Sequence, residues 1–211
     1  KKPKIDFLKM YHSLMLANPI NFDEIIKMSY SEFIAEWKWD GIRVQLSINS
    51  DKIKIFSRTG DEISISFPEI ESYFKNNKKK LVIDGELLVG KNFKPLSFNC
   101  LQKRLNRKKP SKKIIEMLPP FIKAYDILFF QKFDLRKRKL TVRKNILKKF
   151  INFSKIEILD FSENLNFKDW ENLKKIKDKG TNELGYEGIM LKRKNSLYKS
   201  GREKGLWYKW K

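Results

Sequence analysis

The length of 211 residues suits one domain, or one domain with short terminal extensions, and 41% hydrophobic residues are typical of a folded globular protein. No apolar run approaches the roughly 20 residues that cross a bilayer. Cys100 and His12 are the only cysteine and histidine, which excludes an internal disulfide and multi-cysteine or paired-histidine metal sites and favours a reducing cytoplasm. The formal net charge of +22 favours a polyanionic partner such as nucleic acid over a membrane surface, although many of the lysines are expected to form a solvated surface.

The first third of the chain changes from a helical to a strand pattern. Residues 21–28 predict a short helix capped by an asparagine. A β-rich stretch at 33–39 follows. Alternation of apolar and polar residues at 44–48 and 53–56 then predicts two strands that each bury one face. The polar residues 49–51 between these strands predict a hairpin turn.

The remaining two thirds mix helical and strand patterns. Helices are predicted at 68–74, 97–105, 111–118, 141–151 and 167–179, and strands at 81–83, 121–130, 156–159, 188–191 and 206–210. Residues 84–86 are expected to form a turn at the end of a strand. Because no regular β-α-β rhythm is present, we predict an α+β fold rather than a doubly wound sheet.

The sharpest local feature for chemistry lies at residues 38–43. Lys38 ends an apolar strand, Asp40 lies two residues later, and a glycine permits a tight turn before Arg43. A lysine amine attacks as a nucleophile only when it is unprotonated, so such a lysine needs partial burial or cationic neighbours. The ordinary alternative is a strand-turn-strand unit with a solvent-reaching lysine and a common Asp-Gly turn.

Four further clusters place charged or aromatic residues beside apolar strands: Asp84-Gly85-Glu86, Tyr125-Asp126, the segment from Glu187 to Lys192, and Lys209 with Lys211. Asp126 stands inside an apolar run, where a charge is costly without a partner. Lys209 and Lys211 are two residues apart, so strand geometry places both on one side, which suits binding of a phosphate. A solvated turn, core packing and an amphipathic edge strand are the ordinary alternatives.

In this order, the clusters resemble the motifs of the covalent nucleotidyltransferases, which comprise DNA ligases, RNA ligases and mRNA capping enzymes. Residues 38–43 resemble the nucleophile motif Lys-x-Asp-Gly-x-Arg, and 57–60 resemble the next motif, whose arginine contacts phosphate. The match is closest to ATP-dependent DNA ligases, and residues 36–45 and 101–105 are similar to a bacterial and archaeal branch. The resemblance runs from about Glu36 to the last residue.

The resemblance implies a fold of antiparallel sheets flanked by helices, with the nucleotide in a cleft between them. It also implies that Lys38 attacks the α-phosphate of ATP, forms a lysyl-AMP phosphoramidate and releases pyrophosphate. AMP would then pass to the 5′-phosphate of nicked double-stranded DNA, and the 3′-hydroxyl would displace it. Such transfer depends on positioning and charge neutralisation.

The roles implied for other residues follow the motifs. Those for the nucleotide are Glu36 at the adenine edge, Tyr125 on the adenine face, Arg43 and Glu86 at the ribose, Arg58 at phosphate, and Lys209 and Lys211 at the α-phosphate. Lys192 and Arg143 are further candidates for nucleotide contact. Glu187, with Glu86, would bind Mg²⁺ (or Mn²⁺), a hard ion that prefers carboxylate and water ligands. Asp40 is expected to organise the turn around Lys38.

The resemblance also sets expectations for domain organisation. Residues 1–32 would be a lead-in segment within the core domain, and 33–211 the adenylation domain. A C-terminal OB-fold, which family members carry, and an N-terminal DNA-binding domain, which many of them carry, are expected to be absent from this chain. We therefore expect a monomeric catalytic core that adenylates slowly alone and seals nicks poorly.

Two other classes of function stay open from the sequence. An RNA ligase or a GTP-using capping enzyme shares the nucleophile motif, whereas NAD⁺-dependent ligases resemble the chain less around Arg43. A basic, non-catalytic nucleic-acid-binding module would explain the charge and the aromatic content. That module gives no reason for Glu86, Asp126 and Glu187 to occur in this order.

Overall fold

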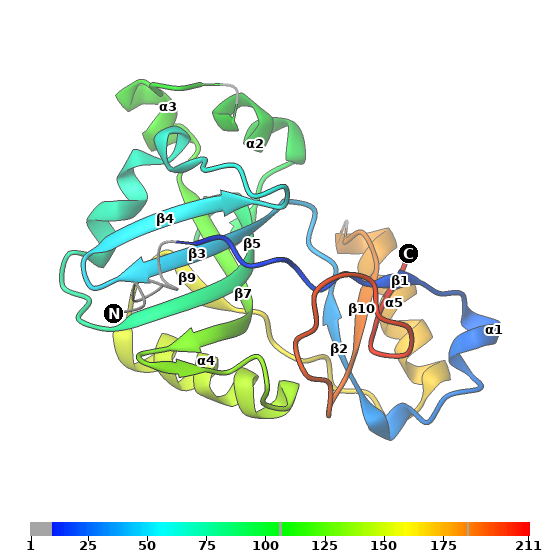
Figure 1. The fold of residues 1–211 in the computed structure, drawn as a ribbon. Coiled ribbons are helices and arrows are strands. Elements are labelled where there is room, and N and C mark those ends of the chain that lie inside the picture. Colours follow the sequence, from blue (N-terminus) through cyan, green and yellow to red (C-terminus); the bar gives the residue numbers. More distant parts are fainter. Residues whose placement is uncertain (1–9, 106, 185) are drawn as a thin grey trace. The chain divides into compact units, whose positions relative to one another are not determined.

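The computed structural model describes residues 10–105, 107–184 and 186–211, and the chain forms two compact units in it (Figure 1). Each unit is described by itself. Within the described residues, unit 1 comprises 10–13, 41–136 and 143–161, and unit 2 comprises 14–40, 137–142 and 162–211. The lead-in segment predicted at 1–32 contributes to both units, and its first nine residues lie outside the described ranges.

Unit 1 is built on a largely antiparallel sheet with the strand order β4-β3-β5-β7-β8. In addition, β6 pairs with β5, and β9 pairs with β7 in parallel. The strands are β3 (Ile42–Asn49), β4 (Lys52–Ser57), β5 (Lys80–Lys91), β6 (Lys94–Pro95), β7 (Pro120–Phe130), β8 (Phe133–Asp134) and β9 (Leu159–Phe161). The predicted hairpin is confirmed, because β3 pairs antiparallel with β4 and Ser50 between them has a φ of 59°.

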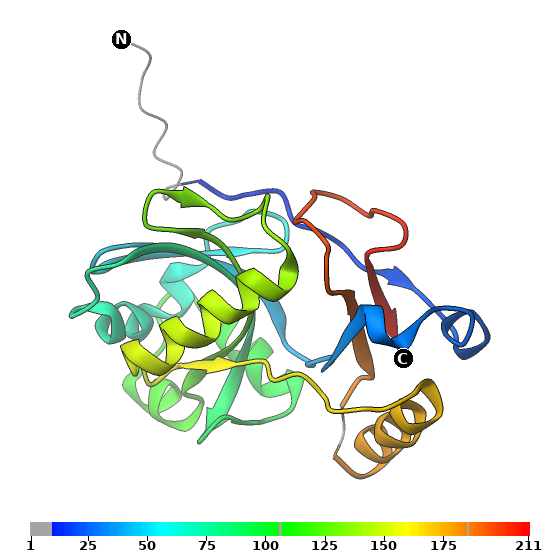
Figure 2. The ribbon, with the colours of Figure 1, turned by 90° about the horizontal axis from the view of Figure 1, so that it is seen from below.

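Helical segments complete unit 1. They are η3 (Ser64–Ser66), η4 (Pro68–Phe74), α2 (Phe98–Leu105), α3 (Lys112–Met117) and α4 (Leu140–Ser154), of which the part from Arg143 belongs to this unit. The helix predicted at 68–74 is present as a 3-10 helix with a proline in its first turn. Figure 2 shows α4 running alongside the sheet of unit 1.

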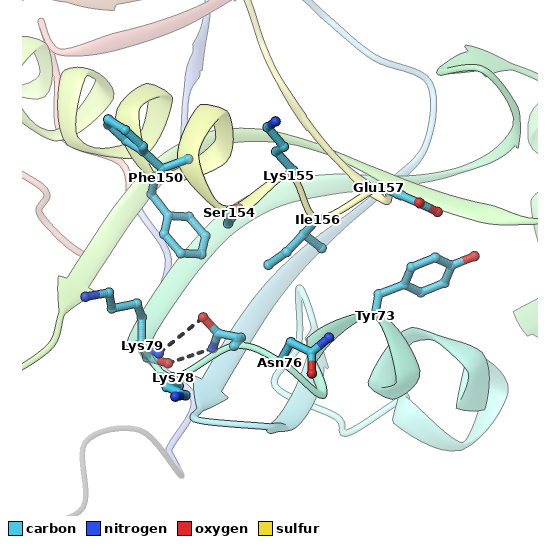
Figure 3. A pocket seen from close by; sticks show the side chains of 11 residues that line it. Tyr73, Asn76, Lys78, Lys79, Phe150, Ser154, Lys155, Ile156 and Glu157 are labelled. Carbon is cyan, nitrogen blue, oxygen red and sulfur yellow. Dashed lines mark hydrogen bonds between the residues drawn. The ribbon is translucent and has the colours of Figure 1, made fainter.

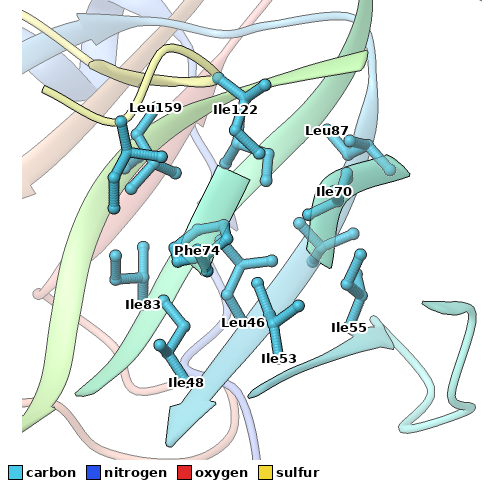
Figure 4. Packing of buried hydrophobic residues seen from close by; sticks show 14 of the residues in the cluster. Leu46, Ile48, Ile53, Ile55, Ile70, Phe74, Ile83, Leu87, Ile122 and Leu159 are labelled. Carbon is cyan, nitrogen blue, oxygen red and sulfur yellow. The ribbon is translucent and has the colours of Figure 1, made fainter. Parts of the chain in front are cut away.

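The hydrophobic core of unit 1 lies on one face of this sheet. Buried members from four strands, η4 and β9 are Leu46, Ile48, Ile53, Ile55, Ile70, Phe74, Ile83, Leu87, Ile122 and Leu159 (Figure 4). Each such side chain stabilises the fold by about 1.5–3 kcal/mol when fully buried. Because residues two apart along a strand share a face, Arg43 on β3 and Asp84 and Glu86 on β5 project from the opposite face.

The turn predicted at residues 84–86 is wrong. All three residues lie inside the 12-residue strand β5, which pairs with β3 on one side and with β7 on the other. Glycine and two acidic residues favour a turn in isolation, but here both neighbouring strands satisfy the backbone groups. Gly85 also fits a close approach, since a Cβ there would lie 2.8 Å from Ile122 Cγ2.

Unit 2 contains a four-stranded sheet with the order β1-β11-β10-β2. Its elements are β1 (Asn18–Pro19), α1 (Phe22–Ile25), η2 (Tyr30–Glu32), β2 (Phe33–Trp37), α5 (Trp170–Leu184), β10 (Ile189–Arg193) and β11 (Trp207–Trp210). The predicted cap is confirmed, since Asn21 caps α1 through a reciprocal capping box with Glu24, but the helix ends at Ile25 and not at the predicted residue 28. Phe33, Trp170 and Leu191 belong to the core between the sheet and the helices.

The predicted α+β class is confirmed, since both sheets are largely antiparallel and helices pack against them. One strand is displaced, because the segment predicted at 156–159 forms β9 three residues later, at Leu159–Phe161. No helix in the described ranges combines the length and the apolar character needed to cross a bilayer.

Candidate active site

The predicted nucleophile, Lys38, directly follows β2 in unit 2. Its backbone N–H donates to Gly188 O at 2.9 Å, and Glu187 N–H donates to Lys38 O at 3.3 Å. These bonds extend the pairing of β2 with β10 beyond the ends of both strands. Lys38 and Glu187, which are 149 residues apart in the sequence, are therefore held side by side by the sheet.

Glu187 accepts hydrogen bonds from two ammonium groups. Lys38 Nζ donates to one carboxylate oxygen, Oε2, and Lys211 Nζ donates to the other, Oε1, at 2.7 Å. The Lys38 and Glu187 side chains are 21% and 31% exposed. The structure thus brings together the predicted nucleophile, a predicted metal ligand and a predicted phosphate-binding lysine, at a place that solutes can reach.

The charge of Glu187 is stabilised by its partners. Partial burial alone would raise the pKa of its carboxyl group, but the hydrogen bonds and positive charges of Lys211 and Lys38 outweigh burial and lower the pKa below its ordinary value. Glu187 is therefore an anion at neutral pH. A carboxylate that is charged at neutral pH suits a hard cation as well as an ammonium group.

Aromatic rings lie on either side of Lys38 in the sequence. Trp37 stacks on Tyr186 with 4.3 Å between ring centroids, and Trp39 meets the same ring edge-on at 5.3 Å. Trp39 Nε1 also donates to Ser162 Oγ at 3.2 Å. Tyr186 precedes Glu187, so this aromatic cluster fixes the chain segments that carry both members of the ion pair.

Glu36 and Lys192 form a second ion pair in unit 2. Lys192 Nζ lies 3.1 Å from Glu36 Oε1, and the two side chains are 2% and 1% exposed. The ammonium group also lies 4.7 Å from the centre of the Trp207 ring. Two residues predicted to contact the nucleotide therefore lie together as a buried pair on neighbouring strands, β2 and β10.

Lys209, on β11, is half-buried opposite Met190 of β10.

In unit 1, Arg43 makes a bidentate ion pair with Asp84. Nε donates to Oδ1 at 3.0 Å and Nη2 to Oδ2 at 2.6 Å, and Asp84 is fully buried. Glu86 is the cross-strand neighbour of Arg43. The guanidinium also lies 5.8 Å from the centre of the Tyr125 ring. Three residues predicted to bind the nucleotide thus share one region of unit 1, and Asp84, which was not among them, fixes the arginine.

Tyr125 occupies a β-bulge. Asp84 is opposite Asp126 in the register while Gly85 is opposite Ala124, so Tyr125 is the extra residue on β7. A bulge redirects a side chain relative to a regular strand. Asp126 beside it forms a bidentate ion pair with Arg143 of α4, with two contacts of 2.8 Å and no exposure of either side chain.

The need for a partner at Asp126 is therefore confirmed, and Arg143 is that partner. Arg143, a further candidate named from the resemblance, is fully buried in the interior of unit 1. Sequence patterns show that a buried carboxylate needs a cation; they do not show which of the many basic residues supplies it.

Arg58 is exposed in the turn that follows β4. The turn is held by hydrogen bonds among its own side chains, including Ser57 Oγ with Thr59 Oγ1 at 2.9 Å. The Arg58 carbonyl oxygen accepts a hydrogen bond of 2.6 Å from the hydroxyl of Tyr11. No sequence pattern points to Tyr11, which lies 47 residues before Arg58.

The described ranges contain no group of three or more His, Cys, Asp or Glu side chains arranged to hold a metal ion. Of the two predicted metal ligands, Glu187 belongs to unit 2 and Glu86 to unit 1. Mg²⁺ commonly uses one or two carboxylates and fills its remaining positions with water and substrate phosphate. Glu187, which is anionic and partly exposed, fits such a role.

A pocket of about 560 Å³ in unit 1 contains none of these residues. It is formed by the segment that carries Asn76 and Lys79 and by the end of α4 with Phe150 and Ser154, as Figure 3 shows. Asn77 Nδ2 donates to Ser50 O at 2.7 Å, which places the pocket at the far end of β3 from Arg43. The pocket is therefore separate from Arg43 and its partners in unit 1.

Comparisons with known proteins agree on one family. A family model described as "ATP dependent DNA ligase domain" matches residues 14–211. The DNA ligase of Methanococcus aeolicus is 31% identical over 198 residues, which is 93% of this chain and 34% of that protein. The probable DNA ligase of Koribacter versatilis is 36% identical over 124 residues, covering 58% and 22% of the two chains.

Among solved structures, a mycobacterial DNA ligase D complexed with ATP and MES superposes with a TM-score of 0.75 at 22% identity, covering 98% of this chain and 61% of that chain. This likeness shows the fold. The chain spans about a third or less of the length of the two curated relatives. Because the family model covers nearly the whole sequence, the chain belongs to the ATP-dependent DNA ligase domain family.

Proposed function

We propose that this chain is the nucleotide-transfer core of an ATP-dependent DNA ligase, with Lys38 as the nucleophile. The amine attacks the α-phosphorus of ATP, a phosphorus–nitrogen bond forms, and the bond to the leaving pyrophosphate breaks. AMP then moves from Lys38 to the 5′-phosphate at a nick in double-stranded DNA, and the 3′-hydroxyl displaces AMP to form the phosphodiester. The observation that carries this proposal is the contact of Lys38 and Lys211 with the two oxygens of Glu187.

The residues of unit 2 support the chemical steps. Lys38 Nζ is held against Glu187 by their ion pair, so attack on the α-phosphorus requires release of this contact and transfer of a proton from the amine to water. Lys211 and Lys209 carry positive charge that offsets the negative charge developing on the α-phosphate. Lys192 fixes the carboxylate of Glu36 by their buried ion pair, and Glu36 contacts the adenine edge.

The residues of unit 1 bind the rest of the nucleotide in this proposal. Tyr125 stacks on the adenine face from its bulge, and Arg43, which is oriented by Asp84, contacts the ribose together with Glu86. Arg58 contacts phosphate from its exposed turn. A bidentate arginine has few alternative positions, so the Asp84 contact reduces the entropy lost when Arg43 binds its ligand.

Mg²⁺, or Mn²⁺, is the metal that this chemistry implies. Glu187 would hold it, with Glu86 as a further carboxylate, and the ion would supply neutralisation of phosphate charge. Glu187 fits the role because its partners keep it anionic while leaving it partly exposed.

The proposal extends to partners and location. The net charge of +22 supports binding of nicked DNA through phosphate contacts. We propose that the protein acts as a monomer in the cytoplasm, in replication, repair or recombination of DNA, and that an OB-fold domain outside this chain completes the enzyme.

The test is adenylation of the purified chain with α-labelled ATP and Mg²⁺, followed by intact-mass measurement and peptide mapping. The expected result is one added AMP on Lys38, absent in Lys38→Ala and retained in Lys179→Ala, an exposed lysine of the same unit. Labelling at a different lysine would overturn the assignment. GTP in place of ATP, and a chase with nicked DNA or nicked RNA, distinguish a capping-type enzyme or an RNA ligase from a DNA ligase.

A further inference from the structure

The segment at residues 10–13 crosses unit 1 next to the candidate nucleotide-binding residues. His12 and Gln45 bond reciprocally: His12 N–H donates to Gln45 Oε1 at 2.7 Å, and Gln45 Nε2 donates to His12 O at 3.1 Å. Gln45 is fully buried on β3, two residues after Arg43 and opposite Asp84. The side-chain amide of Gln45 thus satisfies both backbone polar groups of His12, as a neighbouring strand would. These bonds fix the segment on the polar face of the sheet.

This attachment places the side chain of Tyr11 against the turn that carries Arg58. The Tyr11 hydroxyl donates to Arg58 O at 2.6 Å. The ring packs beneath Gly60, where a Cβ would lie 3.0 Å from Tyr11 Cδ1 and where φ is +93°. Only glycine adopts this φ without strain, so the turn closes tightly over the ring.

Charged groups also surround the Tyr11 hydroxyl. Burial raises its pKa, while Arg43 lowers it, Asp84 raises it and Arg58 lowers it, with a net shift upward. The hydroxyl therefore remains protonated at neutral pH and can donate to Arg58 O throughout the physiological range. Because the charges of Arg43 and Arg58 act on this hydroxyl, Tyr11 lies close to residues of unit 1 assigned to the nucleotide.

We propose that Tyr11 is a positioning residue for Arg58: its hydroxyl and ring hold the turn at 57–60 so that the exposed guanidinium meets phosphate of the bound nucleotide. This inference rests on the proposed role of Arg58. Without the hydrogen bond, the turn keeps its internal bonds but loses its attachment to the segment at 10–13. The arginine then samples more orientations and binds phosphate with a greater loss of entropy.

Tyr11→Phe removes one oxygen atom and keeps the ring beneath Gly60, so the variant is expected to fold. Equilibrium binding of ATP and of adenosine is measured by calorimetry, and the concentration dependence of lysyl-AMP formation is measured with α-labelled ATP. The expected result is a dissociation constant for ATP raised roughly 2- to 10-fold, with binding of adenosine unchanged. Tyr73→Phe, an exposed tyrosine of the same unit, serves as the matched control and should behave as the unmodified chain.

Arg58→Ala and the double variant separate the possible outcomes. If Arg58→Ala weakens ATP binding and Tyr11→Phe causes no further loss in its presence, the two residues act as one unit and the inference holds. If Arg58→Ala weakens binding but Tyr11→Phe alone does not, or if the two losses add, the positioning role is wrong while the role of Arg58 stands. If Arg58→Ala has no effect, the assigned role of Arg58 itself fails, and the inference fails with it.

Discussion

Lys38 and Glu187 form an ion pair between the residue that follows β2 and the residue that precedes β10. The backbones of the same residues continue the antiparallel ladder. The two side chains are therefore held at contact distance by the backbone hydrogen bonds of the sheet. Because the backbone holds both residues in place, a single substitution can change the charge of one of them and leave the other in position.

The first prediction concerns Glu187→Gln. The amide keeps the shape of the side chain but removes the charge that pairs with Lys38 and Lys211. Lysyl-AMP formation should fall by roughly 100-fold or more, since a preorganised charged group at a phosphoryl-transfer site is removed. Labelling with α-labelled ATP measures the loss. Glu183→Gln, an exposed glutamate on α5, is the control, and equal rates for the two variants would remove Glu187 from the mechanism.

The second prediction follows from the lowered pKa of Glu187, in which burial is outweighed by the bonds from Lys211 and Lys38. A carboxyl group with a lower pKa in the folded chain binds fewer protons there than in the unfolded chain. It therefore stabilises the fold above its unfolded pKa, near 4.5, and this contribution is lost as pH falls through the folded pKa. The difference in melting temperature between the unmodified chain and Glu187→Gln should be constant above about pH 6 and should shrink in more acidic buffers. A difference in melting temperature that grows on acidification would contradict a lowered pKa of Glu187 in the folded chain.

The third prediction concerns the buried pair of Asp126 and Arg143. Arg143→Met leaves a carboxylate without its partner in the interior of unit 1, and the free energy of unfolding should fall by about 3–5 kcal/mol. Combining it with Asp126→Leu removes the unpaired charge and should recover most of the loss. Urea unfolding of the three proteins measures both steps. Equal stability of the single and double variants would contradict this account.

The fourth prediction concerns Gly85. In Gly85→Ala, the new Cβ would lie 2.8 Å from Ile122 Cγ2 and 3.0 Å from Lys123 O, so β5 and β7 must separate at the bulge. The cost should be about 1–3 kcal/mol in the free energy of unfolding. The ATP dissociation constant should rise as well, because Tyr125 sits in the same bulge. Urea unfolding measures the change in stability, and calorimetry measures the dissociation constant for ATP. An unchanged free energy of unfolding would show that β5 and β7 accommodate the new methyl group without cost, against this prediction.

Sequence patterns were sufficient where a local rule decides the structure. Alternation predicted the hairpin of β3 and β4, and the capping residues predicted α1 and α3. They failed at Asp84–Glu86, because a preference for turns is local whereas the pairing of β5 with two neighbours is not. Tyr11 illustrates the same limit in the site. Its contact with Arg58 depends on the path of the backbone at residues 10–13, which the reciprocal hydrogen bonds of His12 and Gln45 fix. The periodicity of a sequence does not predict such hydrogen bonds.

Each of the two units is assembled from three separate stretches of sequence, so the polypeptide passes from one unit to the other repeatedly. No single cleavage can release either unit as an uninterrupted fragment. A truncation that removes all of one unit would therefore also remove part of the other, and limited proteolysis is expected to yield nicked species instead of two separable modules. Point substitutions, and not deletions, are the appropriate means of assigning its parts.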